Sequence, residues 1–464
     1  MLVLDRQSGT PLYEQIYMYI KSNIESGVLA AGRRLPSVRA LAGEIGVSKI
    51  TVEQAYVQLA AEGYLKAHDR APYEVLELPL NYDQPRREVS HFDDMMSKTI
   101  KKEVRKQSLL YNFATGAMDP EGFDYSRWKR YIGYVLREPE RLMAYGNPQG
   151  ERELRLQLQS YLSAARGVNT TVEQIIVSSG TQPMVSAIAS LLKRQGLTTI
   201  GIEKEALSGV KTIFEDYGFT VVEIKQRSET LFDILEQAQV EVVYCTPSHC
   251  DRSGSVMTAA RRKELLHWAK QGQRYIIEDD YDSELRYYGR PIESLQGMNG
   301  ADCVIYLGTP SKVLPPSIRL SYMVLPPPLW MEFIPYRHRY KQSASVMEQL
   351  VWARFIEAGE WSKQIRRLRK HYADKSKLMV QYLTEEFGPK ITVKAPEGGV
   401  YISLVVQMKV NAKELVALAR HDGCDVRRGE DTPYGVQCIL SFSAIPTNQL
   451  GVAIKQLAKA WKGI

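Results

Sequence analysis

A single lysine lies between two apolar runs, with a hydroxyl side chain before it and an arginine after it. Lys312 follows the strand-like run 304–306, and residues 320–325 are apolar again. Ser311 directly precedes the lysine, and Arg319 stands seven residues behind it. Because lysine forms Schiff bases with carbonyl cofactors and arginine pairs with phosphate, the segment indicates a site for pyridoxal phosphate (PLP). The alternative is a surface loop that carries one lysine and one arginine.

Three further polar motifs follow or precede elements that could present them to the same ligand. Residues 178–182, SSGTQ, come after an apolar run and before a helical stretch, so their backbone amides could hold a phosphate. Asp279 and Tyr281 follow the run RYII, and such a pair could contact a pyridine nitrogen and a ring oxygen. The turn 145–150, YGNPQG, precedes an amphipathic helix. A helix cap or a plain turn is the alternative for each motif.

The elements that would position these residues alternate in type from residue 111 to residue 464. Apolar or β-branched runs such as VEVVYCTPS, RYIIEDD and CVIYLGT are separated by helical stretches such as PMVSAIASLLKR and AARRKELLHWAKQ. This alternation predicts an α/β domain with a mainly parallel sheet. Ligands of such sheets bind beyond the carboxyl ends of the strands. We therefore expect the polar motifs to lie close together.

Residues 1–75 carry a different pattern, with two short helices joined by a glycine. Ser37 can cap the first helix, Gly46 fits the turn, and Ser48 can cap the second helix. This is the signature of a helix-turn-helix, whose second helix enters the DNA major groove by its N-terminal end. Basic side chains surround the pair and could neutralise phosphates: Arg33, Arg34, Arg39 and Lys49. A small helical interaction domain with a basic face is the alternative.

The remaining features bound the class of protein. Residues 76–110 are polar and contain prolines, which predicts an exposed linker; its basic run 98–106 is read as a solvated helix face or a tether. A length of 464 residues with 24% charged residues indicates a soluble protein of two or three domains, and the net charge of +7 permits a polyanionic partner. The sequence shows no membrane-length apolar run and no signal-peptide pattern, and its five cysteines are scattered. We expect a cytoplasmic protein.

Two sets of stretches resemble known families. LPSVRALAGEIGVS followed by TVEQAYVQLAAEGYL resembles the winged helix-turn-helix of the GntR superfamily of bacterial regulators. The motifs around the lysine together resemble fold-type I aminotransferases. YGNPQGERELR, RYIIEDDYDSELRY and YLGTPSKVLPPSIRLSYMVLP match more narrowly, so the chain resembles the MocR (GabR-like) regulators, which fuse the two domains. The resemblance implies an aminotransferase-like sheet with helices on both faces, a homodimer, and operator DNA and a small-molecule effector as partners.

The resemblance also implies roles for individual residues. Lys312 would form the Schiff base with PLP, Asp279 would face the pyridine nitrogen, and Tyr281 would contact the ring hydroxyl. The phosphate group would be held by the residues around the glycine turn and the lysine: Gly180, Thr181, Gln182, Ser311 and Arg319. Tyr145 would reach the phosphate of the neighbouring subunit. The DNA contacts would come from the helix pair and its basic surroundings: Arg34, Ser37, Arg39, Ser48, Lys49 and Thr51.

The sequence departs from the family pattern in the DNA-binding segment and in the ligand pocket. Ile50 stands where the recognition helix usually has an asparagine, and it could touch only a thymine methyl group. The wing segment 68–73 lacks the usual Gly-rich tip, which argues against DNA contacts from the wing. In the ligand pocket, Leu207 replaces an aromatic residue of the family. Segment 249–254, which includes Asp251, departs from the family pattern His-Gln-x-Pro-Thr-Gly. Gly435 is aligned with the arginine that holds a substrate carboxylate in the family.

These departures favour a sensor over a catalyst. A bidentate arginine is the usual partner of a carboxylate, and its absence argues against efficient transamination. We therefore expect a DNA-binding transcriptional regulator whose large domain binds PLP on Lys312 and senses PLP or a small amine or amino-acid effector. Two alternatives stay open: an active aminotransferase with an accessory DNA-binding domain, and a regulator whose large domain no longer binds PLP and only dimerises.

Overall fold

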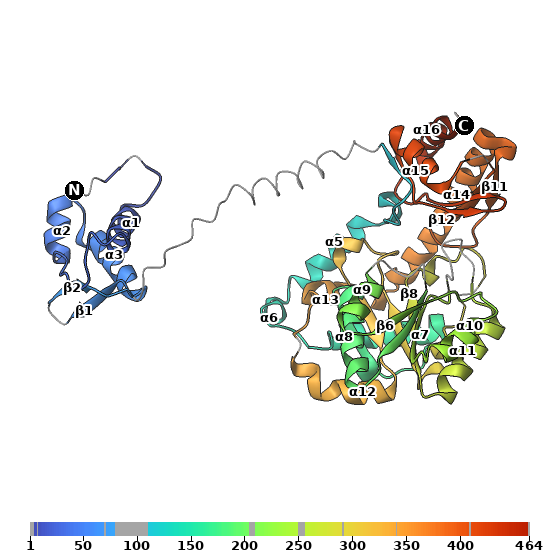
Figure 1. Ribbon diagram of the computed structural model, residues 1–464, viewed down its shortest axis with the longest axis horizontal. Helices are drawn as coiled ribbons and strands as arrows, with labels where there is room; N and C mark the ends of the chain where they lie inside the picture. Colours follow the sequence, from blue (N-terminus) through green and yellow to red (C-terminus); the bar gives the residue numbers. More distant parts are fainter. Residues whose placement is uncertain are drawn as a thin grey trace. The chain divides into compact units, whose positions relative to one another are not determined.

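The computed structural model divides the chain into two compact units, residues 1–105 and 106–464 (Figure 1). It describes residues 4–6, 8–68, 71–78, 110–203, 209–248, 256–289, 292–339, 341–407 and 410–462. Most of the linker predicted at 76–110 lies outside these residues. The domain boundaries given above therefore stay predictions, and each unit is described by itself.

The N-terminal unit is a helical trio followed by a hairpin. Its elements are α1 (Leu12–Glu25), α2 (Val38–Ile45), α3 (Lys49–Ala61), β1 (Leu65–His68) and β2 (Ala71–Val75). The Oγ atoms of Ser37 and Ser48 accept hydrogen bonds from the amides of Ala40 and Thr51, both at 3.2 Å, so both predicted caps are confirmed. Gly46 ends α2 in the left-handed conformation, with φ +68°, that a glycine adopts without strain. β1 and β2 pair antiparallel as the wing.

The core of this unit comes from apolar residues one helical turn apart. Ile16, Ile20 and Ile24 of α1 are buried against the buried face of α3. That face consists of Val52, Ala55, Tyr56 and Leu59. The Tyr56 hydroxyl donates to the carbonyl of Pro36 at 3.1 Å, which ties α3 to the start of α2.

The large unit is built on a seven-stranded sheet in the order β4-β10-β9-β8-β7-β5-β6. The strands are β4 (Ile175–Ser178), β5 (Thr199–Glu203), β6 (Thr220–Ile224), β7 (Val242–Cys245), β8 (Tyr275–Asp280), β9 (Val304–Gly308) and β10 (Ser321–Val324). Strands β5 to β9 pair parallel, and β10 runs antiparallel to both of its neighbours. This confirms the mainly parallel sheet.

Helices cover both faces of this sheet, as expected. Successive strand residues point to opposite faces, and Val242 and Val243 accordingly belong to different hydrophobic clusters. One cluster includes side chains of α7 (Arg152–Arg166), α8 (Thr181–Arg194) and α13 (Val346–Glu357); the other includes side chains of α10 (Leu231–Gln237) and α11 (Ala259–Gln271). The remaining helices before the C-terminal part are α5 (Tyr125–Val135), α6 (Pro139–Leu142), α9 (Val210–Asp216) and α12 (Pro327–Phe333).

A second, antiparallel sheet follows, which the sequence interpretation did not predict. Its strands, in the order β11-β12-β15-β14, are β11 (Ile391–Lys394), β12 (Tyr401–Val406), β15 (Gly435–Ser441) and β14 (Glu430–Thr432). The long helix α14 (Glu360–Phe387) leads to it, and α15 (Ala412–His421) and α16 (Leu450–Lys462) complete this part. β13 (Cys424–Asp425) pairs parallel with β3 (Tyr111–Asn112), which brings residues 113–118 to this part. No helix in the described parts of the chain has the length and apolar character of a membrane span.

Candidate cofactor site and nucleic-acid interface

The topology brings the predicted cofactor motifs to one edge of the large sheet. β8 and β9 run parallel, and β4 has the same direction because both β4 and β9 pair antiparallel with β10. The carboxyl ends of these three strands therefore lie at the same edge. The segments at or beyond those ends are 178–182, 279–281 and 309–312, and Arg319 precedes the adjacent start of β10. The topology thus brings three of the four predicted motifs to one edge of the sheet.

Arg319 lies against the glycine turn that begins α8. Gly180 has φ +130° and is the N-cap of α8, and a Cβ atom built on it would lie 2.4 Å from Nη2 of Arg319. Arg319 itself adopts the left-handed conformation (φ +55°, ψ +54°) at the end of a 3₁₀ turn, Pro316–Ile318. A guanidinium group beside the free amides of a helix N-terminus is a strong anion site. Thr181 and Gln182 form the first turn of this helix.

Hydroxyl groups organise the loop between β9 and the lysine. The Oγ1 atom of Thr309 lies 2.8 Å from Oγ of Ser311 and donates to the carbonyl of Leu320 at 3.1 Å. This bond joins the loop before Lys312 to the residue after Arg319. Thr309 was not among the residues assigned from the sequence, although its place directly after a buried strand could have indicated it.

Lys312 lies among residues that the sequence interpretation did not assign. Its Nζ atom donates to the carbonyl of Gly116 at 2.6 Å and lies 6.0 Å from the ring centroid of Tyr401. A Cβ atom on Gly116 would lie 2.1 Å from the Tyr401 hydroxyl and 2.8 Å from Nζ of Lys312. A side chain at position 116 would therefore force the ends of Tyr401 and Lys312 to move. Both neighbours are brought in by the second sheet and its β3 pairing, so no local signal around Lys312 could have found them.

Asp279 is the buried acid of the site. Its side chain is almost fully buried, and its Oδ2 atom accepts a hydrogen bond of 2.6 Å from the hydroxyl of Tyr244 on β7. Burial raises the pKa of Asp279 to about 7. Tyr281 follows β8 directly and is half-buried. Tyr244 was not predicted, because its contact depends on the pairing of β7 with β8.

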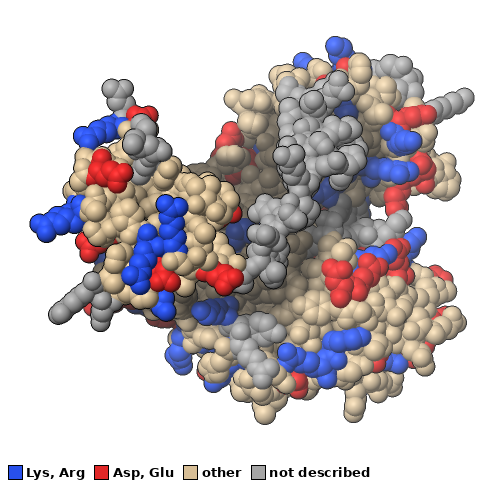
Figure 2. All heavy atoms as spheres, turned by 60° about the vertical axis from the view of Figure 1, so that its left-hand side comes forward, with Lys and Arg blue, Asp and Glu red and all other residues tan. Residues whose placement is uncertain are grey.

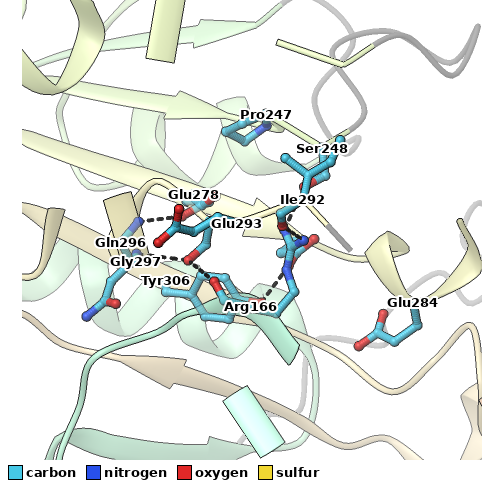
Figure 3. A network of polar contacts seen from close by, with 12 residues as sticks. Arg166, Pro247, Ser248, Glu278, Glu284, Ile292, Glu293, Gln296, Gly297 and Tyr306 are labelled. Carbon is cyan, nitrogen blue, oxygen red and sulfur yellow. Dashed lines mark hydrogen bonds and ion pairs between the residues drawn. The ribbon is translucent and has the colours of Figure 1, made fainter. Parts of the chain in front are cut away.

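A polar network fixes the end of β8 next to Asp279 (Figure 3). The buried guanidinium of Arg166 donates to Oδ2 of Asp280 at 2.7 Å and to Oγ of Ser248 at 2.7 Å. The Tyr306 hydroxyl on β9 donates to the same carboxylate oxygen of Asp280. The Glu278 carboxylate accepts hydrogen bonds from the backbone amides of Leu295 and Gln296, at 2.9 and 3.1 Å. These bonds hold the strand that carries Asp279 to its neighbours.

The structure corrects the expected place of one pocket residue. Gly435 lies at the turn between β14 and β15 with φ +126°, and a Cβ atom there would lie 2.2 Å from the carbonyl oxygen of Val406. No arginine could occupy this position, so the alignment of Gly435 with the carboxylate-binding arginine is wrong in register. Tyr401, the neighbour of Lys312, pairs with Ser441 at the opposite end of β15. Strand β15, Gly435–Ser441, contains no arginine in any register.

Another arginine, Arg427, lies near the aromatic neighbour of Lys312. The guanidinium carbon of Arg427 lies 5.8 Å from the ring centroid of Tyr401, and its Nε atom donates to the carbonyl of Ala114. Arg427 follows β13, whose pairing with β3 the sequence did not reveal. Leu207 and Asp251 lie outside the described residues. Tyr145 is exposed, with the Lys341 ammonium 4.4 Å from its ring centroid, and its role toward a neighbouring subunit stays a prediction.

The predicted DNA contacts gather at the start of α3 and on α2. The Oγ atom of Ser48 lies 2.7 Å from Oγ1 of Thr51, so these two hydroxyls organise the first turn of α3. Lys49 and Ile50 are exposed on the same turn, and Arg39 is exposed on α2. Arg34 is exposed, and its backbone forms an isolated antiparallel β-bridge with Glu74 of the wing. Figure 2 shows acidic and basic side chains interspersed over the surface turned to the viewer, with no face of one charge in that view.

Comparison with known proteins identifies both parts. Residues 12–75 match the model of bacterial regulatory proteins of the gntR family, and residues 112–450 match that of aminotransferase class I and II. The chain is 34% identical to the HTH-type transcriptional regulator YdeL of Bacillus subtilis, over 99% of this chain and 98% of that protein. It is 28% identical to the probable rhizopine catabolism regulatory protein MocR of Rhizobium meliloti, over 99% and 96%. The kynurenine aminotransferase of Pyrococcus horikoshii has the same fold, with a TM-score of 0.67 at 23% identity, over 81% of this chain and 98% of that one.

The fold and the matches define a helix-turn-helix transcriptional regulator that carries an aminotransferase-like domain. The chain belongs to the MocR subfamily of the GntR-type regulators.

Proposed function

We propose that the large domain of this regulator binds PLP on Lys312. The signal that it senses would be either PLP itself or a small amine or amino-acid effector. The observation that carries the proposal is the contact of Arg319 with Gly180. It joins a guanidinium group to a helix N-terminus at the sheet edge where Lys312 and Asp279 lie.

The residues at this edge fit PLP in chemistry. The phosphate would be held by the helix-terminal amides with Gly180, Thr181, Gln182, Ser311 and Arg319. The amine of Lys312 would bind the aldehyde, and the Asp279 carboxyl would keep the pyridine nitrogen protonated, with Tyr281 near the ring hydroxyl. When bound, PLP supplies an electron-poor ring that withdraws electrons from a bound amine. Tyr244 and the Asp280 network would hold Asp279 in place throughout.

We further propose that the domain senses rather than turns over amino acids efficiently. β15 offers no arginine to a substrate carboxylate, which removes the bidentate contact that such enzymes use. Arg427 and Lys312 both lie near the ring of Tyr401, so Arg427 offers a different place for an anionic group. An active aminotransferase and a large domain without PLP remain the two competing functions.

The DNA-binding proposal assigns the operator contacts to the first turn of α3 and to α2. Lys49, Thr51 and Arg39 are the proposed groove and phosphate contacts, with Ser37, Ser48 and Arg34 at the helix ends and beside the wing. A homodimer would present two such units to paired half-sites. Because its partner is operator DNA, the proposed location is the cytoplasm.

Absorbance and DNA binding test these proposals on the same preparation. The full-length protein with PLP is expected to show a visible absorbance band that borohydride removes and that Lys312→Ala lacks. Lys394→Ala, which changes an exposed lysine on β11, is the matched control. A band that persists in Lys312→Ala would overturn the assignment of the lysine.

Two further measurements test the competing functions. Measurable turnover of amino donors would favour the aminotransferase. The lack of any mobility shift with DNA upstream of its own gene would contradict the DNA-binding proposal.

A further inference from the structure

The exposed side of α3, the second helix of the helix-turn-helix, carries a line of mostly apolar residues. Ile50, Gln54, Val57 and Ala61 are all exposed, and they stand four, three and four residues apart. At about 3.6 residues per turn, this spacing places the four side chains on one line along the helix. We call these four residues the α3 stripe. The buried residues of α3, which pack on α1, occupy the opposite side of the helix.

The side chains of the stripe are available to a partner. Ile50 is 66% exposed and Val57 is 53% exposed, so two large aliphatic groups lie in water on one helical face. The Gln54 amide forms no hydrogen bond with another residue in the described part of the chain, whereas the next glutamine, Gln58, donates to Glu62 at 3.1 Å. A partner that covers the stripe therefore gains apolar burial and one amide that can both donate and accept.

The surroundings of the stripe fit a DNA duplex. Lys49 and Thr51 stand one residue before and one residue after Ile50, which is about 100° to either side of it around the helix. With Lys49 and Thr51 toward the two sides of the groove, Ile50 lies between them and faces the base edges. A recognition helix enters the major groove by its N-terminal end. Ile50 and Gln54 belong to the first two turns of α3, so they reach the bases before Val57 does.

The types of these two residues decide which bases they can read. Ile50 has no donor or acceptor, and the apolar group on the major-groove edge of a base pair is the methyl group of thymine. The amide of Gln54 can donate to N7 of adenine and accept from its N6 amino group. Guanine presents two acceptors there, so it leaves the amide oxygen of Gln54 unpaired. Residues 50 and 54 are about 6 Å apart along the helix, which corresponds to about two base-pair steps of roughly 3.4 Å.

We propose that the α3 stripe reads two A·T base pairs that lie within about two steps of each other. Ile50 packs on the methyl group of a thymine, and Gln54 bonds to an adenine. This inference rests on the proposed DNA binding by the helix pair and adds the base preference to it. Ile50 and Gln54 are thus specificity-determining residues, whereas Lys49 beside them contributes an attraction to phosphate that does not depend on sequence.

Selection from a random duplex library, followed by removal of single methyl groups, tests the preference. The full-length protein, with and without added PLP, is mixed with duplexes that carry a random central segment, and the bound duplexes are sequenced. The preferred half-site is expected to contain A·T pairs at two nearby positions. Each thymine of the preferred site is then replaced singly by deoxyuridine, which removes only the methyl group. At one position of the half-site, fluorescence anisotropy is expected to show an affinity loss of about fourfold, the contribution of one buried carbon group.

Variants assign the two contacts to their residues. In Ile50→Ala, the same deoxyuridine substitution is expected to have almost no effect, because both changes remove one contact. The salt dependence of binding is expected to stay that of the parent, since Ile50 carries no charge. Val28→Ala shortens an aliphatic side chain of similar exposure, 63%, outside the helix pair, and this matched control should keep the full deoxyuridine response. Gln54→Ala is expected to lose the preference for adenine at one position in a repeated selection.

The possible results separate this inference from DNA binding as such. If no duplex is bound at any salt concentration, DNA binding itself is contradicted, and the inference with it. If a preferred site exists but tolerates deoxyuridine at every thymine, or if Ile50→Ala responds to deoxyuridine as the parent does, the contact of Ile50 is overturned while DNA binding stands. An unchanged selected site in Gln54→Ala overturns the adenine contact in the same way. Both side chains are exposed, so the variants are expected to fold as the parent does.

Discussion

At the scale of single residues, the proposed phosphate site depends on the missing side chain of Gly180. Gly180→Ala would place a methyl group 2.4 Å from Arg319 and would force a non-glycine residue into φ +130°. We expect a loss of about 1–3 kcal/mol in stability from the strain and a marked loss of PLP affinity from the displaced guanidinium. PLP titration and denaturant unfolding measure the two effects.

Gly196→Ala separates these two contributions. Gly196 also has a positive φ, +83°, but its Cβ would meet no heavy atom within 4 Å. Gly196→Ala is therefore expected to lose stability by a similar amount and to keep its PLP affinity. Equal PLP affinity in both variants would contradict the role given to the Arg319–Gly180 contact.

Asp279 gives the PLP-free protein a distinct pH dependence. Burial raises its pKa from the ordinary 3.8 to about 7 in the folded protein, so the folded state holds this proton more tightly than the unfolded state does. The contribution of Asp279 to stability therefore falls as pH rises from about 4 to about 7, and the full penalty is present above that range. Asp279→Asn removes the penalty. Without PLP, we expect this variant to be more stable than the parent by roughly 2–4 kcal/mol near pH 8, and by less near pH 5. Urea unfolding at both values provides the measurement, and a pH-independent difference would contradict the burial of the charge.

At the scale of elements, a buried ion pair ties the segment before α5 to α14. Nζ of Lys375 lies 2.5 Å from Oδ2 of Asp119, and both side chains are almost fully buried. Nε2 of His371 lies 2.7 Å from the same oxygen. Burial alone would raise the pKa of Asp119, but the bonds from His371 and Lys375 outweigh it and hold the pKa below its usual value. This acid therefore adds stability above its unfolded pKa, and that stability is lost as pH falls through the folded pKa.

Breaking this pair is expected to be costly. Lys375→Met leaves the Asp119 carboxylate buried without its ammonium partner, so we expect a loss of about 3–5 kcal/mol in unfolding free energy. The double variant with Asp119→Asn is expected to regain part of that loss, because no buried charge is left unpaired. Equal stability of the single and double variants in denaturant unfolding would show that removing Lys375 does not leave the Asp119 carboxylate unpaired.

Single elements also explain which parts of the fold and of the candidate site could be predicted from the sequence and which could not. The parallel strands could be predicted because β7 and β9 are buried along their whole length and β8 from Ile276 onward, and the site motifs lie at or directly after the ends of such runs. Gly116 and Tyr401 could not be found, because only the long-range pairing of β3 with β13 and of β12 with β15 brings them to Lys312. Gly435 was misplaced because neither its positive φ nor the carbonyl of Val406 against it can be read from residue types.

At the scale of the whole molecule, DNA binding should be electrostatic and local. The net charge of the chain is only +7, and charges of both signs share the visible surface (Figure 2). Lys49→Ala is expected to weaken DNA binding and to lower the slope of log affinity against log salt by about 1, the loss of one phosphate contact. Fluorescence anisotropy over a salt series measures the slope. Lys394→Ala, in the other unit, should leave it unchanged, and the same slope in both variants would remove Lys49 from the interface.

A sensor also requires coupling between the two units, so that ligand binding to the large unit changes the affinity of the N-terminal unit for DNA. Binding free energies are reciprocal, so if PLP changes the affinity for DNA, DNA must change the affinity for PLP by the same factor. We expect a change of about fivefold or more in operator affinity between PLP-free and PLP-loaded protein, within the usual range of such couplings. Lys312→Ala should bind DNA as the PLP-free parent does and should not respond to PLP. The two affinities, measured by anisotropy and by PLP titration with and without operator DNA, must give one coupling factor. A protein that shows the borohydride-sensitive absorbance band but an unchanged operator affinity would hold PLP without sensing it, and the effector would then have to be a further molecule that binds to the loaded domain.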